Sequence, residues 1–303
     1  MTILSTLGPL LASLLVGFWF KIPFLNQHIV SKSLSYLTYL ILGFIGYSIG
    51  ALDNLMEKVA IAGTQAAVLF LFITLLPLIA LWISGQFMHA SHSTTLNVDN
   101  KTAMKQALID ATITLAWVIA GTVLGFFLKH WLSNVDEFVT WLLYALLLLV
   151  GCQLRQENHR LRKLFLNKQG GVIALVAIST TLIGGLIGGA LLGLNWNHSL
   201  AAVSGFGWYS LSGILITGLG DPVLGTTAFL LDISREIVAL MLVPFLARIN
   251  SHMSVGYAGA TAMDFTLPLL GKCHGVEVVP VCIASGFIMS FFVPFLIPLF
   301  MGL

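Results

Sequence analysis

Residues 222–249 decide how this chain folds, and they read PVLGTTAFLLDISREIVALMLVPFLARI. This stretch is long enough to cross a bilayer as a helix, since about 20 apolar residues suffice. Its middle nevertheless carries Asp232, Arg235 and Glu236. An ionisable group near the bilayer centre costs about 2.5–3.5 kcal/mol on insertion scales and marks a substrate or ion pathway by default. Asp264, in the apolar stretch Val255–Leu270, points to such a pathway as well.

The composition predicts an all-α polytopic membrane protein. Of the 303 residues, 58% are hydrophobic and only 9% are charged, whereas soluble domains carry about 25% charged residues. A net charge of +2 without a basic patch argues against nucleic acid as a partner. The first apolar run, Ile3–Phe20, lacks a basic start and a cleavage site, so we expect a retained span and not a signal peptide.

Eight segments qualify as membrane spans by length and hydropathy: Ile3–Phe20, Leu34–Ala51, Val59–Ser84, Ala111–Trp131, Phe138–Gln153, Gly171–Leu194, Pro222–Ile249 and Val278–Met301. Two further segments, Ser199–Gly220 and Val255–Gly271, are short or broken and rich in glycine. We expect eight transmembrane helices plus two re-entrant segments. The alternative is ten transmembrane helices, of which two are discontinuous but cross completely.

Basic residues predict the orientation, because loops rich in Lys and Arg stay in the cytoplasm. The segment Leu154–Lys168 contains five of them and is expected inside. Counting spans in both directions places the N-terminus and the C-terminus outside. We expect the spans to be surrounded by membrane lipid.

Two internal repeats support a transport architecture. Residues 1–195 are expected to form two inverted three-span repeats, because GFWFK and the span after it reappear as GFFLK and its successor. Residues 196–303 repeat a broken segment plus a span: SGFGWYSLSG parallels SVGYAGATAMD, and VPFL occurs twice. Inverted repeats with broken helices at the midplane are typical of secondary transporters. The alternative is that hydrophobic helices resemble one another by composition alone.

The first broken segment contains GFGWYSLSG, residues 205–213. A membrane helix breaks only where protein or a wet cavity satisfies its backbone, and the N-terminus of a half-helix suits a carboxylate. We therefore predict binding residues here, namely Gly207, Tyr209, Ser210 and Ser212. The alternative is a small-residue packing face.

The second broken segment contains ATAMDFTLPLL, residues 260–270. Pro268 favours a break because it lacks an amide donor. We predict that Asp264, with Thr261 nearby, binds a cation or a proton. The alternative is that Asp264 only caps the second half-helix.

The DISRE motif divides into two predicted roles. Asp232 and Arg235 are three residues apart and share a helix face, so we expect a structural ion pair. Glu236 is then left for substrate or proton binding; a purely structural ion cluster is the alternative.

Other chemistry finds little support. The segment His89–His92 has two histidines but no further ligands, so no metal site is predicted. The cysteines Cys152, Cys273 and Cys282 are scattered. There is no phosphate-binding loop for ATP. An intramembrane aspartyl protease needs paired carboxylates, and Asp264 has no GxGD-like context. We expect neither a cofactor nor an enzyme.

The motifs together resemble one family. ILGFIGYSIGALDNL, ASGFGWYSLSGILIT, LLDISREIVAL and GATAMDFTLPLL are similar to the LysO-type L-lysine exporters, over nearly the whole chain. The resemblance implies an inner-membrane exporter of lysine and thialysine, in which two intramembrane acids, here Glu236 and Asp264, are needed for export. We expect alternating access with exchange for protons. The alternatives are a passive channel for cationic amino acids and a transporter of another small cation or organic ion. The coupling ion stays open, and so does the oligomeric state, a homodimer included.

Overall fold

The computed structural model describes residues 2–20, 26–51, 54–88, 101–128, 135–156 and 167–302, and within them all secondary structure is helical. A long helix occupies each predicted span: α1 (Thr2–Trp19), α2 (Gln27–Gly50), α3 (Leu55–Phe87), α4 (Lys101–Phe127), α5 (Val135–Gln156), α7 (Lys168–Leu192), α10 (Pro222–Ile249) and α13 (Val279–Met301). By length and composition α2, α3, α7 and α13 could each cross a membrane. The expected all-α polytopic membrane protein is confirmed.

The helices of the N-terminal region pack in pairs: α1 on α5, α2 on α4 and α3 on α7. Glycine allows the close approach, since a Cβ at Gly17 would collide with the Leu148 carbonyl and a Cβ at Gly46 with the Val118 carbonyl. Small residues play this part in membrane helix pairs, where backbones must come close to pack well. A repeat would match α1, α2 and α3 with α4, α5 and α7, in that order. This match turns the α1–α5 pair into the α4–α2 pair and leaves the α3–α7 pair unchanged.

The first broken segment is a helical hairpin, which we call hairpin 1. It consists of α8 (Trp196–Val203), an irregular tip at residues 204–208 and α9 (Tyr209–Gly218). Its two ends lie together, since Nδ1 of His198 is 3.9 Å from Oδ2 of Asp221, the residue that caps α10. The chain therefore enters and leaves hairpin 1 near the same end of α10.

The second broken segment, hairpin 2, also folds back. It consists of α11 (Ser251–Ala258), the 3-10 helix η1 (Gly259–Met263) and α12 (Leu267–His274), with its tip at residues 259–266. Oγ of Ser254, in the first turn of α11, is 2.7 Å from Nε2 of His274 at the end of α12. A short 3-10 turn, η2 (Val276–Val278), then leads into α13.

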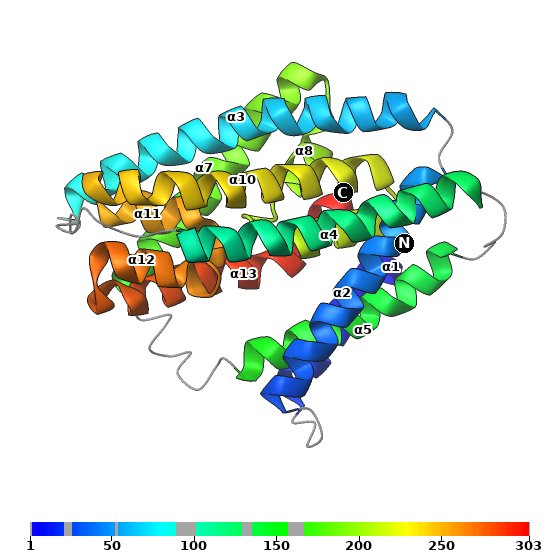
Figure 1. Ribbon diagram of the computed structural model, residues 1–303, viewed down its shortest axis with the longest axis horizontal. Helices are drawn as coiled ribbons and strands as arrows, with labels where there is room; N and C mark the ends of the chain where they lie inside the picture. The colour runs from blue at the N-terminus through cyan, green and yellow to red at the C-terminus, as the bar shows by residue number, and fades with distance from the viewer. Residues whose placement is uncertain are drawn as a thin grey trace.

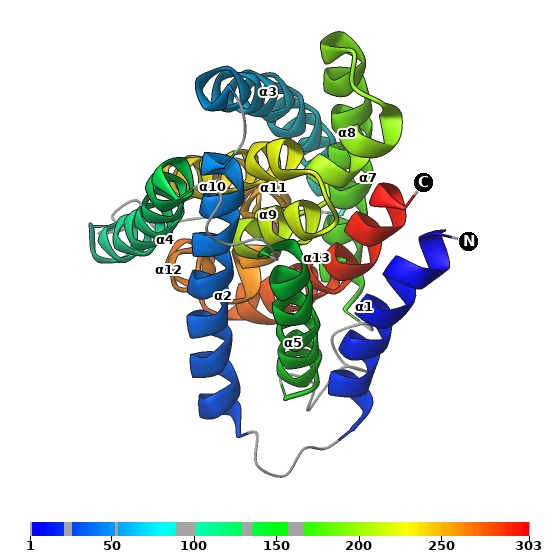
Figure 2. The ribbon, with the colours of Figure 1, turned by 90° about the vertical axis from the view of Figure 1, so that its right-hand side faces the viewer.

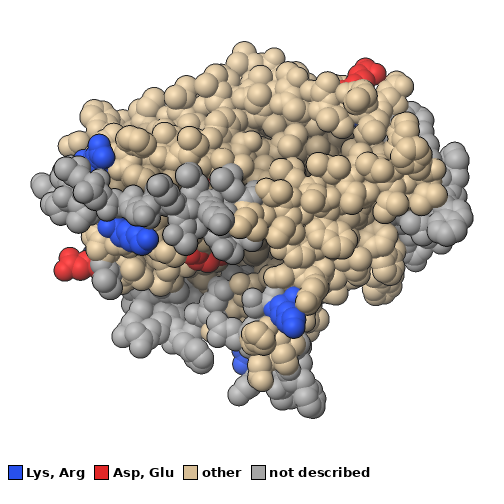
Figure 3. Space-filling model, in the orientation of Figure 1, with Lys and Arg blue, Asp and Glu red and all other residues tan. Residues whose placement is uncertain are grey.

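Helix α10 runs through the middle of the structure. Figure 1 shows α3, α10 and α4 extending side by side along the molecule, with α11 and α12 near one end. In the view along this direction, α9, α10 and α11 lie in the centre, and α2, α3, α4, α5 and α7 surround them (Figure 2). The visible face is largely uncharged, with isolated acidic and basic patches (Figure 3), as a lipid-facing surface requires.

Candidate functional site

The two hairpins approach the middle of α10 from its opposite ends. Hairpin 1 begins beside Asp221, at the N-terminus of α10, and hairpin 2 follows Asn250, directly after its C-terminus. The tips meet where the Phe206 carbonyl accepts a hydrogen bond from the Ala260 amide at 3.0 Å. Two irregular backbone stretches thus contact each other inside the protein, beside the charged middle of α10. Irregular backbone at this depth is tolerated where protein or a wet cavity surrounds it.

The tip of hairpin 1 is attached to α10 through Asp232. Its Oδ1 accepts a hydrogen bond from the Gly207 amide at 2.8 Å, and its Oδ2 accepts one from the Ser212 hydroxyl at 2.6 Å. Asp232 and Ser212 are both completely buried. The structure therefore gives two of the predicted binding residues, Gly207 and Ser212, contacts that hold the tip in place.

Arg235 does not form the predicted ion pair with Asp232: within the described residues the two side chains make no salt bridge or hydrogen bond. Asp232 points toward the tip of hairpin 1. The Arg235 guanidinium instead lies 5.9 Å from the Tyr257 ring centre, next to the tip of hairpin 2. Arg235 is 1% exposed, and none of its three guanidinium nitrogens has a hydrogen-bond partner among the described residues. Sharing a helix face was not sufficient: Asp232 bonds to Gly207 and Ser212 of hairpin 1, whereas Arg235 lies against Tyr257 of hairpin 2.

Glu236 is the next residue along α10 and is 9% exposed. Adjacent residues on a helix point in different directions, so Glu236 and Arg235 do not face each other. A carboxylate this deep in an apolar helix is costly and is retained where it has a function or a partner.

Asp264 lies at the far end of tip 2, between η1 and α12. Its side chain is exposed, and its Oδ1 accepts a hydrogen bond from the Phe265 amide. It is not the cap of α12, because the N-cap position is occupied by Thr266. The structure thus offers no support for the capping alternative.

The remaining predicted binding residues lie around the two tips. Ser210, in the first turn of α9, is half-buried, and Tyr209 packs edge-on against Phe229 at 5.8 Å between ring centres. The Thr261 hydroxyl donates to the Ala258 carbonyl at 2.9 Å, which stabilises the turn into η1.

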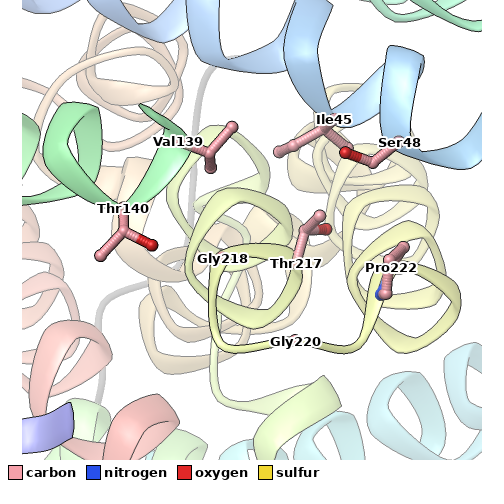
Figure 4. A pocket seen from close by; sticks show the side chains of 8 residues that line it. All are labelled: Ile45, Ser48, Val139, Thr140, Thr217, Gly218, Gly220 and Pro222. Carbon is pink, nitrogen blue, oxygen red and sulfur yellow. The ribbon is translucent and has the colours of Figure 1, made fainter. Parts of the chain in front are cut away.

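A cavity of about 180 Å³ lies at the end of hairpin 1 that leads into α10. It is bounded by α2, α5 and the turn from α9 to α10, and Figure 4 shows its lining residues, which are Ile45, Ser48, Val139, Thr140, Thr217, Gly218, Gly220 and Pro222. One of these residues, Thr217, is the second-last residue of α9. The cavity does not include the charged residues of α10.

Sequence reasoning missed the contact between the tips and the part that Tyr257 plays beside Arg235. The glycine at position 259 was the sequence signal for the first. In the structure its φ is +72°, and an added Cβ would collide with the Phe206 carbonyl. Two predictions, the His89–His92 segment and most of the basic loop Leu154–Lys168, lie outside the described residues. Within the described part of the chain, no cluster of three His, Cys, Asp or Glu residues has the geometry for a metal ion.

Comparison with known proteins decides the family. A family model described as "Lysine exporter LysO" matches residues 115–301. The chain is 38% identical to "Lysine exporter LysO" of Escherichia coli (strain K12) over 295 residues, which cover 96% of this chain and 97% of the relative. The chain belongs to the LysO lysine exporter family.

A second relative is shorter. The "Putative lysine exporter" of Haemophilus influenzae (strain ATCC 51907 / DSM 11121 / KW20 / Rd) is 38% identical over 186 residues, covering 61% of this chain and 95% of the relative. No solved structure matches this chain. The LysO resemblance seen in the sequence motifs is thereby confirmed, and the LysO-family match includes both hairpins, α10 and α13.

Proposed function

We propose that this protein is a secondary active exporter of L-lysine, and of its analogue thialysine, which exchanges the amino acid for protons. Its family supports the substrate, because both relatives are named as lysine exporters. The observation that carries the mechanism is the meeting of the two hairpin tips, Phe206 to Ala260, beside Asp232, Arg235 and Glu236 of α10.

The tips suit a substrate that carries both charges. The N-termini of α9 and α12 and the C-termini of α8 and α11 all lie at the tips. Helix N-termini favour negative groups and helix C-termini favour positive ones. An amino acid with a carboxylate and two ammonium groups matches such a mixed set of helix ends, as in transporters built from broken helices.

Glu236 and Asp264 are proposed to bind the cationic groups and the proton. Glu236 is buried in the middle of α10, whereas Asp264 is exposed. This difference suits two binding positions along one transport pathway, of which one is accessible and the other occluded. Ser210 and Tyr209 are proposed as further contacts at the start of α9.

Energetics favour coupling over leakage. Lysine leaves as a net cation against an inside-negative potential, which costs about 2.3 kcal/mol per 100 mV. That is roughly a 50-fold penalty in the concentration ratio, since 1.4 kcal/mol is tenfold. Exchange for one inward proton cancels the charge movement, and a carboxylate that binds either a proton or an ammonium group provides the exchange.

The proposed setting is the bacterial inner membrane with both termini outside. Hairpin 1 then enters from the outside and hairpin 2 from the cytoplasm. Residues 1–195 are proposed to form two inverted three-span repeats, which the exchange of the α1–α5 and α2–α4 pairs supports. Residues 196–303 form the transport site.

The test is lysine efflux from inside-out and right-side-out vesicles with the pH gradient and the electrical potential imposed separately. We expect a proton gradient to drive lysine uphill at zero potential. A passive channel would instead follow the potential and never concentrate lysine.

A further inference from the structure

Arg235 has more hydrogen-bonding capacity than the protein around it uses. A guanidinium presents five N–H donors in a planar fork. Arg235 is 1% exposed, so solvent does not satisfy these donors, and its Nε, Nη1 and Nη2 atoms have no acceptor among the described residues. Leaving the donors of a charged group unsatisfied in the interior is strongly destabilising. An anionic acceptor at this place removes that cost.

The surroundings of the guanidinium favour an anion from outside the protein. The nearest acid on its own helix face, Asp232, is already bonded to Gly207 and Ser212. Tyr257 presents its ring to Arg235, and its hydroxyl lies 3.3 Å from Thr74 instead. The second acid of the motif, Glu236, points in another direction from the helix.

The guanidinium also lies at the junction of the tips. Its Nη2 atom is 3.3 Å from the place where a Cβ of Gly259 would stand, and Gly259 precedes the Ala260 amide that bonds Phe206. The absence of a side chain at Gly259 keeps this approach open. The helices α9 and α12 begin at the two tips, and their N-termini carry no side-chain cap. Uncapped helix N-termini add further N–H donors with a positive dipole end.

We propose that Arg235 binds the α-carboxylate of the transported amino acid. This inference rests on the proposed function and adds to it the group that distinguishes an amino acid from a simple diamine. A guanidinium and a carboxylate form two parallel hydrogen bonds, which fix orientation as well as charge. The carboxylate is then held at the tip junction, and the ammonium groups extend toward the acids.

The charge balance agrees with this arrangement. Asp232 and Arg235 cancel each other within α10, so Glu236 and Asp264 remain as two negative charges. Bound lysine adds one carboxylate at Arg235 and two ammonium groups for the two acids. A diamine without the carboxylate leaves the guanidinium donors unsatisfied, and a site built to bond a polar group rejects analogues that lack it.

The experiment compares ligands and variants in purified, reconstituted protein. Binding of L-lysine, L-lysinamide and 1,5-diaminopentane is measured by thermal shift and by competition against radiolabelled lysine in proteoliposomes. For the wild-type protein we expect both carboxylate-free ligands to bind at least tenfold more weakly than lysine. In Arg235→Gln this preference should fall to within threefold, and Arg235→Lys should give an intermediate value because it keeps the charge but not the fork.

Arg248→Gln is the matched control, since it removes the same residue type from the exposed end of the same helix. It should keep the wild-type preference. Equal wild-type affinity for lysine and lysinamide overturns the inference, and so does an Arg235→Gln protein that still prefers lysine tenfold. If Arg235→Gln does not fold, the wild-type ligand series decides alone. A wild-type protein that exports no lysine refutes the proposed function itself, which is a different result.

Discussion

Phe206 and Ala260 join the two hairpin tips: the carbonyl of Phe206 accepts a hydrogen bond from the amide of Ala260 at 3.0 Å. The two residues are 54 positions apart and belong to hairpins that reach the centre from opposite ends of α10. Phe206 is fully buried and has a φ of +50°, a left-handed conformation that is a genuine outlier for a bulky residue. Such backbone conformations persist only where the surrounding structure holds them, and they cluster at functional sites.

Gly259→Ala tests this junction. Gly259 has a φ of +72°, and an added Cβ would collide with the Phe206 carbonyl. We expect a loss of about 1–3 kcal/mol from backbone strain and a severe loss of export, measured as melting temperature in detergent and efflux per inserted molecule. Gly271→Ala is the control, because its Cβ would meet only ordinary contact at 3.9 Å. A Gly259→Ala protein with normal stability and transport would contradict the importance of the tip contact.

Asp232→Asn should lower stability more than it alters transport chemistry. Both oxygens of Asp232 accept hydrogen bonds, from the Gly207 amide and the Ser212 hydroxyl. In Asn, an NH₂ group replaces one of the two acceptor oxygens. Either the Gly207 amide or the Ser212 hydroxyl then loses its acceptor, at a cost of about 1–3 kcal/mol. The expected result is reduced membrane abundance and a lower melting temperature, with export per remaining molecule largely kept.

Glu236→Gln should impair transport and leave stability unchanged. We expect normal abundance but no coupled export, because Gln keeps the shape of the side chain and loses its charge and its proton. The measurement is efflux per inserted molecule, in parallel with Asp232→Asn. Should Glu236→Gln export normally while Asp232→Asn is inserted but inactive, the two acids have the reverse roles.

Asp264→Asn should abolish export and leave the protein folded and inserted. Asp264 is exposed and does not occupy the cap position of α12, which belongs to Thr266. The Oδ1 atom of its side chain accepts a hydrogen bond from the adjacent Phe265 amide, which an Asn carbonyl can also accept. Equal activity of the Asn variant and the wild type would leave Asp264 without a part in transport.

Reporter fusions test the orientation. A fusion at residue 160 should read as cytoplasmic, since the segment Leu154–Lys168 carries five basic residues.

A thiol placed at Ser48, beside the cavity at the end of hairpin 1 that leads into α10, should react with a membrane-impermeant reagent added from outside. The native cysteines are buried and should react little. Labelling from the cytoplasmic side alone would invert the proposed topology.

The sequence by itself determined the helices. A run of about 20 apolar residues has one inexpensive conformation in lipid, a helix that satisfies its own backbone. The predicted spans therefore match α1–α5, α7, α10 and α13, with ends that differ by a few residues. Glycine clusters likewise predicted where hairpins 1 and 2 break, because a break needs residues that tolerate unusual φ values.

Only the tertiary structure decided what the charges contact. Spacing along a helix predicted that Asp232 would pair with Arg235, but the partners of Asp232 come from Gly207 and Ser212, which no local rule brings near. Hydrogen bonds between distant segments depend on the path of the chain in space, and that path is set by the packing of whole helices. The same holds for the contact of Phe206 with Ala260 and for the burial of Arg235 beside Tyr257.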